Sequence, residues 1–209
     1  QTSILDASKK PFEANLVFAL CRNYPGEYGE KIANIALNTY VNQCGQATLA
    51  AAEASRENGN SPNTVVSGAV AIVGKKMVGP AMDASKALMN LFQFAKFSNP
   101  DDSFDYAEQL RSAKADKDVL LAGADDKFAD SIAACLSQDP QSVFIKFLLD
   151  FAKQEGGKPS TDAMIAAIWT TLGWSAMKSK KITKGTIARL TWYSRIYSTI
   201  VGVAASAGK

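Results

Sequence analysis

Few residues in this chain could carry out acid–base or nucleophilic chemistry, because its 209 residues include no histidine. That absence excludes serine–histidine–aspartate and cysteine–histidine catalysis, most catalytic zinc sites, and the usual general base near neutral pH. Cys21, Cys44 and Cys135 lie far apart in apolar stretches and form no CxxC pair. They are typical of core residues in a reducing compartment. We therefore expect neither a cofactor nor a metal site.

Two short patterns resemble functional motifs but fail on spacing or companions. SGAVAIVGKKM (67–77) has five residues between its glycines, and Lys76 stands where a P-loop has Ser or Thr. Lys75 and Lys76 are interpreted instead as bases at a helix end, where they favourably meet the helix dipole. Ser175 and Lys178 fit the SxxK nucleophile pattern, but its companion motifs S-D-N and K-T-G are missing.

Paired acids occur at Asp101 and Asp102 and again at Asp125 and Asp126. Metal binding or proton transfer is conceivable for such pairs. Both pairs precede stretches with helical spacing, where carboxylates stabilise a helix N-terminus. Helix capping is therefore the favoured interpretation. With every motif set aside, the sequence predicts a protein that is not an enzyme, and a lysine- or carboxylate-based enzyme is the alternative.

Positive charge gathers toward the C-terminal end of the chain. Residues 163–209 carry seven Lys and Arg and no acid, while residues 1–162 carry sixteen bases and twenty acids. Such asymmetry is typical of a protein whose partner carries phosphate or an anionic lipid surface. Neutralisation of this segment by the acidic body, within one molecule or between copies, is the alternative.

The candidate nucleic-acid site lies in KSKKITKGTIARLTWYSRIY (178–197). Lysines in a polar link neutralise phosphates, and an exposed indole on the next helix can stack on an unpaired base for about 1–3 kcal/mol. Single-stranded RNA fits better than duplex DNA, because no recognition helix is evident. A buried indole is the alternative. The predicted contacts are Lys178, Lys180, Lys181, Lys184, Arg189, Trp192 and Arg195.

An anionic membrane is the second candidate partner for the same region. Residues 163–177 and 196–208 are uncharged and apolar to mildly polar, but each is shorter than the roughly 20 residues of a spanning helix. They could lie in the membrane interface, with Trp169, Trp174 and Trp192 at the headgroup level. A third interpretation is a scaffold or adaptor without a ligand.

The elements that must hold these residues are predicted to be helices. Apolar residues recur at three- and four-residue steps, and most of the seven prolines precede such a stretch. The valine-rich residues 64–73 could form a strand, but their length and the preceding Ser61-Pro62 favour a helix. Further helices are expected after Pro80, after the possible cap Asp139, after Ser160, and from about Thr183 to Ala205.

The sequence therefore predicts an all-α fold of about nine to eleven helices. It forms one domain over residues 1–209, or two lobes at 1–98 and 103–209, with short arms at both termini that favour self-association. The predicted function is that of a non-enzymatic, self-assembling coat or nucleocapsid subunit of a virion. It would bind single-stranded RNA through the basic C-terminal segment, 163–209, in the cytoplasm or in a nucleoprotein particle.

Overall fold

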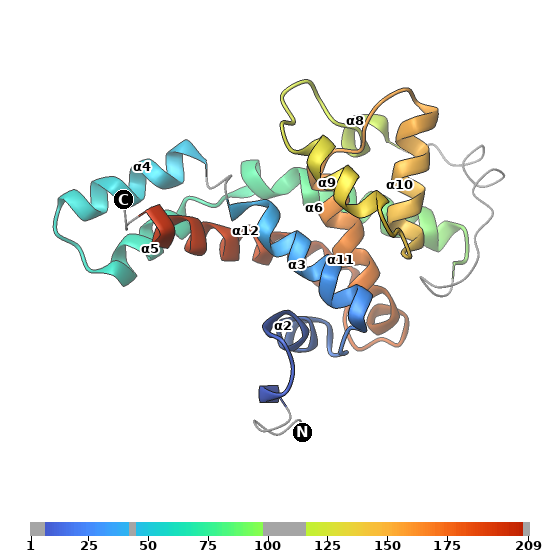
Figure 1. Cartoon of the computed structure of the whole chain (residues 1–209), viewed down its shortest axis with the longest axis horizontal. Helices are drawn as coiled ribbons and strands as arrows, with labels where there is room; N and C mark the ends of the chain where they lie inside the picture. Colours follow the sequence, from blue (N-terminus) through green and yellow to red (C-terminus); the bar gives the residue numbers. More distant parts are fainter. Residues whose placement is uncertain (1–6, 42–44, 98–115, 207–209) are drawn as a thin grey trace.

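The computed structural model describes residues 7–41, 45–97 and 116–206. Over these ranges the chain forms ten helices and no strand, which confirms the predicted all-α fold (Figure 1). One isolated antiparallel bridge joins Leu121 to Pro159. The helices are α2 (Phe12–Cys21), α3 (Glu27–Thr39), α4 (Gln46–Glu57), α5 (Pro62–Ala71), α6 (Lys75–Phe94), α8 (Lys117–Leu120), α9 (Ala129–Ser137), α10 (Val143–Gln154), α11 (Thr161–Lys178) and α12 (Lys184–Ser206).

Helix α11 forms the centre of the core, and 13 of its 18 residues are buried. It packs against α6, α12, α10 and α3. A helix that is apolar on all sides must be surrounded in this way. Trp169 donates a hydrogen bond from its indole nitrogen to the Ser194 hydroxyl of α12, and the Trp174 ring lies 5.0 Å from that of Phe144 on α10. These contacts therefore fix the position of α11, and with it the positions of both helix ends.

The tryptophan rings argue against the membrane interpretation. Trp169 and Trp174 are fully buried and Trp192 is half-buried. The expectation that Trp169 and Trp174 face lipid headgroups is therefore wrong. Among the helices that the structure describes, none is by itself both long and apolar enough to cross a membrane, although the bent pair α5 and α6 meets the criterion together.

The helices at the two ends of the long axis differ in how they are held (Figure 1). At one end α8, α9 and α10 join the main core. At the other end α4 and α5 form a helical pair with a small cluster of their own, made by Ala52, Val65, Ala69 and Val203. Helix α6 precedes the predicted lobe boundary yet packs along α11 and α12, which follow it. The boundary itself lies outside the described residues, and the division into lobes stays a prediction.

Several predicted helix starts are confirmed. The valine-rich segment is helical, with Pro62 as the first residue of α5. Ser160 caps α11 by accepting a hydrogen bond from the Ala163 N–H at 3.0 Å. The last helix begins at Lys184, close to the predicted Thr183.

Two other starts are wrong. Pro80 lies inside α6, which begins five residues earlier at Lys75, because the extended Gly74 starts the helix and the buried Val78 holds its first turns on the core. Asp139 does not cap α10. That cap is Ser142, whose hydroxyl accepts from the Ile145 N–H at 3.4 Å.

Of the two cysteines that the structure describes, Cys21 has the expected core role. Burial raises the pKa of the Cys21 thiol to about 12, which keeps it protonated and unreactive. Cys135 is half-buried. Several predicted features fall outside the described residues, namely Cys44, Asp101, Asp102, the expected helix after Ser103 and the outer parts of both terminal arms.

The close approach of α11 and α12 gives a test of the core. A Cβ atom on Gly173 would lie 2.8 Å from Ile187 Cγ1 of α12. We expect Gly173→Ala to lower the free energy of unfolding by about 1–3 kcal/mol, measured by urea denaturation. The control is Gly68→Ala on α5, where nothing lies within 4 Å of the new Cβ and helix propensity favours alanine by about 1 kcal/mol. Equal stability of both variants would contradict the packing.

Candidate functional site

Two pockets meet at the N-terminal end of α11. The large pocket has a volume of about 730 Å³ and the small pocket about 310 Å³. Asp126 and Asp162 line both of them. The large pocket is lined also by Lys75, Lys76, Gly79, Pro80, Asp83, Asp118, Val119, Leu121, Gly123 and Ser160. The small pocket is completed by Tyr40, Asp125, Lys127, Phe128, Thr161 and Arg195.

The first turn of α11 is held from outside the helix. The Asp126 carboxylate accepts hydrogen bonds from the Thr161 N–H at 2.7 Å and from the Thr161 hydroxyl at 2.6 Å. Beside it, the Ser160 N–H donates to the carbonyl of Leu120 at 2.9 Å. These contacts satisfy N–H groups that have no partner within the helix. Asp162, the second residue of α11, is thereby placed at the wall that the two pockets share.

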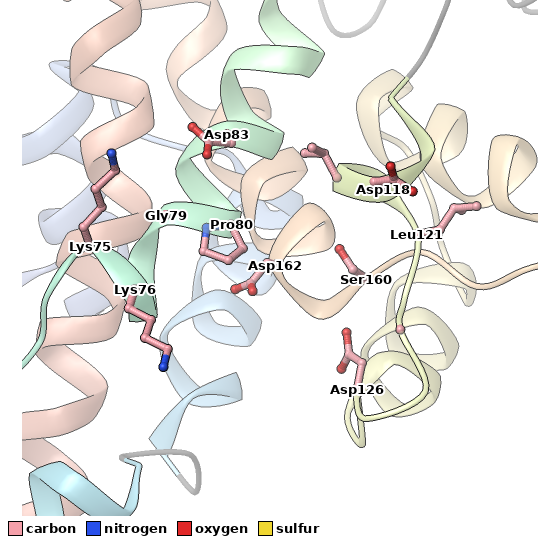
Figure 2. Close-up of a pocket in the computed structure, with 12 residues that line it drawn as sticks. Lys75, Lys76, Gly79, Pro80, Asp83, Asp118, Leu121, Asp126, Ser160 and Asp162 are labelled. Atoms are coloured by element: carbon pink, nitrogen blue, oxygen red, sulfur yellow. The ribbon is translucent and has the colours of Figure 1, made fainter.

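The Asp162 carboxyl is enclosed by side chains from several elements. The Tyr40 hydroxyl at the end of α3 donates a hydrogen bond to its carboxylate, and Tyr40 is only 2% exposed. The Arg195 guanidinium of α12 lies 3.7 Å above the centre of the Tyr40 ring. In Figure 2 the Asp162 side chain lies between α6, which carries Lys76, and the segment that carries Asp126. Three helices thus converge on one carboxyl group.

Burial raises the pKa of the Asp162 carboxyl above its ordinary value. The Tyr40 hydrogen bond and the Arg195 charge oppose this shift, while the Asp126 charge adds to it. Burial and the Asp162 charge also raise the pKa of Tyr40 well above its ordinary value, so that the phenol stays a hydrogen-bond donor. A carboxyl group that holds its proton to higher pH can act as a general acid and base. Among the carboxyl groups that the structure describes, that of Asp162 fits this role.

The two lysines of the rejected P-loop pattern line the large pocket. Lys75 and Lys76 are the first two residues of α6 and are exposed (Figure 2). The interpretation that they favourably meet the helix dipole is wrong, because they lie at the positive N-terminal end. A cation there costs about 0.3–1 kcal/mol. Anions, in contrast, are favoured at a helix N-terminus, so this end of the pocket suits a phosphate or a carboxylate.

The predicted nucleic-acid residues are divided by the structure. Lys178, Lys180, Lys181 and Lys184 gather, exposed, at the link between α11 and α12, where the Lys184 amine donates to the Asn90 side-chain oxygen at 3.1 Å. Contact of this cluster with nucleic acid stays a prediction.

The other three predicted contacts lie further along α12. Arg189 is exposed and donates to the Gly185 carbonyl of its own helix at 3.2 Å. Trp192 is half-buried, between the exposed stacking ring and the buried indole that were the two alternatives. Arg195 is separated from the lysine cluster, because its guanidinium lines the small pocket beside Tyr40.

Asp125 and Asp126 were interpreted as caps of the helix that follows them. That helix, α9, begins only at Ala129. Asp126 does accept from the Phe128 N–H at 3.3 Å, but its two shorter bonds go to Thr161 of α11. Asp126 therefore does cap a helix, but the helix is α11, whose Thr161 lies 35 residues further along the chain.

The raised pKa of Asp162 makes stability depend on pH. A proton held by the folded state stabilises it below the ordinary carboxyl pKa, and this contribution is lost as the pH rises through the raised value. We expect Asp162→Asn, which keeps an acceptor for Tyr40, to be more stable than the wild type at pH 7 and to have no such advantage at pH 3. Urea midpoints at the two pH values test this. Asp118→Asn, on the exposed side of the large pocket, is the control, and an equal gain at both pH values would contradict the assignment.

No protein-family model and no curated protein matches the chain. Among solved structures, the chain is similar to citryl-CoA lyase from Hydrogenobacter thermophilus, with a TM-score of 0.62 and 17% sequence identity. The match covers 96% of this chain and 78% of the lyase chain. At 17% sequence identity this similarity shows that the two chains share a fold.

That fold overturns the predicted function. A non-enzymatic nucleocapsid or coat subunit of a virion was expected from the charge asymmetry, and this prediction is wrong, because the helices follow the arrangement of an enzyme. The alternatives of a membrane-associated protein and of a ligand-free scaffold stay predictions. Self-association through the terminal arms and the cellular location stay predictions.

Proposed function

We propose that the protein is an enzyme of the lyase class that acts on a coenzyme A thioester of a hydroxy acid, with Asp162 as its general acid and base. The observation that carries this proposal is the Asp162 carboxyl: it is enclosed, its pKa is raised, and it stands at the wall shared by two pockets. The fold of citryl-CoA lyase supports the substrate class.

The large pocket supports binding of the coenzyme. Its volume, about 730 Å³, is in the usual range for ligand and cofactor sites. Lys75 and Lys76 stand at its edge on the positive end of α6. Coenzyme A carries several phosphates, and a bound phosphate would offset the unfavourable placement of these two lysines.

The small pocket supports binding of a carboxylate. Arg195 and Lys127 line it and supply positive charge beside the acids, and its volume of about 310 Å³ suits a small acid. The Arg195 guanidinium is oriented by stacking on the Tyr40 ring at 3.7 Å. A planar guanidinium can bind a carboxylate through two parallel hydrogen bonds. The two fragments of a cleaved thioester would then occupy separate pockets on either side of Asp162.

In the proposed reaction Asp162 accepts one proton and then returns it. As a base, the carboxylate takes the hydroxyl proton of a β-hydroxy acyl thioester. The carbon–oxygen bond then becomes a ketone carbonyl, the adjoining carbon–carbon bond breaks, and its electron pair goes to the thioester as an enolate. Protonated Asp162 returns the proton to the enolate carbon. The Tyr40 hydroxyl, which stays protonated, stabilises the carboxylate form of Asp162 in the first step.

Turnover of citryl-CoA tests the role of Asp162. We expect wild-type protein to release a shorter coenzyme A thioester, detected by mass spectrometry. Asp162→Asn should lose about 10²- to 10⁴-fold in rate, the usual contribution of a general acid–base group. Asp118→Asn, which removes an equal charge from the large pocket, is the matched control. Absence of turnover by the wild type, or an Asp162→Asn variant as active as Asp118→Asn, would refute the proposal.

The lysine pair at the start of α6 has its own test, which needs no turnover. We expect the double variant Lys75→Gln/Lys76→Gln to bind free coenzyme A at least tenfold more weakly than the wild type in isothermal titration calorimetry. The wild-type affinity should fall as salt rises, because the contact is between exposed charges. The matched control is Lys178→Gln/Lys180→Gln, which removes the same charge from the α11–α12 link. Equal losses in the two double variants would contradict a local phosphate site.

A further inference from the structure

Asp126 makes contacts that the proposed chemistry does not use. Its carboxylate lines both pockets, yet both oxygens are engaged by protein groups. One oxygen accepts from the Thr161 N–H at 2.7 Å, and the other accepts from the Thr161 hydroxyl at 2.6 Å and from the Phe128 N–H at 3.3 Å. A carboxylate with three donors fixed on it is poorly placed to transfer a proton itself.

These contacts join two segments that are distant in the sequence. The Thr161 N–H belongs to the first residue of α11, which has no carbonyl partner within its own helix. Asp126 supplies that partner from the segment between α8 and α9. The hydroxyl bond to the same residue then fixes the rotamer of the buried Thr161, directly before Asp162. Loss of Asp126 would free both the N–H and the hydroxyl at the point where α11 begins.

We infer that Asp126 is a positioning residue, whose carboxylate holds the first turn of α11, fixes where the Asp162 carboxyl meets the two pockets, and places a negative charge beside it. This inference rests on the proposed role of Asp162. The Asp126 charge acts together with the other titratable groups that line the two pockets. Those groups are Tyr40 of α3, Arg195 of α12, Lys75, Lys76 and Asp83 of α6, Asp118 of α8, and Asp125 and Lys127 next to Asp126.

The neighbouring acid provides a matched control. Asp125 carries the same charge one residue earlier, lines the small pocket and is exposed. Asp126 contributes to the raised pKa of Asp162, and Asp125 is not among the causes of that shift. Replacement of either acid by asparagine removes one unit of charge with almost no change in volume. A difference between the two variants therefore reports the place of the charge and not the net charge of the protein.

The charge is tested by following the Asp162 carboxyl carbon through a pH titration by NMR, on ligand-free protein labelled with ¹³C. We expect the midpoint to move to lower pH in Asp126→Asn, because a like charge beside Asp162 has been removed. In Asp125→Asn it should stay at the wild-type position. A midpoint that is unchanged in Asp126→Asn, or that moves equally in both variants, would overturn the electrostatic part of the inference.

The positioning is tested by amide hydrogen exchange at Thr161. We expect this N–H to exchange at least tenfold faster in Asp126→Ala than in the wild type or in Asp125→Ala. Asp126→Asn, which keeps a side-chain oxygen as an acceptor, should restore slow exchange in part. Unchanged exchange in Asp126→Ala would overturn the positioning role.

Both measurements use the free protein and need no turnover. They can therefore fail while citryl-CoA is still cleaved, and they can succeed while it is not. If the folded fraction of Asp126→Ala falls, the Asp126→Asn titration still decides the role of the charge.

Discussion

Burial of α11 at the centre of the core is the constraint on which the other features depend. Most of its side chains are apolar and buried, and α6, α12, α10 and α3 surround it. At its ends the helix N–H and carbonyl groups that lack partners within the helix need partners from elsewhere. At the N-terminal end, Ser160 and Asp126 supply them. A polar pocket beside a dry core is the direct result, and Asp162 stands where the two meet.

The helices could be predicted because local signals determine them. Apolar spacing, the Pro62 start and the Ser160 cap each act within a few residues, and all three are confirmed. The helix start predicted at Pro80 was wrong because packing of α6 on the core outweighs the preference of proline for a first helical position. The buried face of α6 includes Val78 on one side of that proline and Ala81 on the other, so the helix continues across it.

The site could not be predicted in the same way, since its parts come from distant segments. Tyr40 and Asp162 are 122 residues apart, and no spacing in the sequence links them. One signal was available: Asp162 follows the capping Ser160 at the start of a long apolar stretch, in a chain that has no histidine. Arg195 was selected for its charge, but only the fold shows that it lies against Tyr40, away from the exposed lysines.

The small cluster that holds α4 and α5 has a consequence for the mechanics of the large pocket. This helical pair rests on few buried side chains and on Arg56, which donates to the Val203 carbonyl at 2.8 Å and to the Ser206 hydroxyl at 2.9 Å. Segments with few buried apolar contacts open locally at a lower free energy than that of global unfolding. Helix α5 ends at Ala71, only a short link before Lys75. A ligand that binds the start of α6 would therefore also disfavour local opening of α4 and α5. Occupancy of the pocket would then stabilise helices that do not line it.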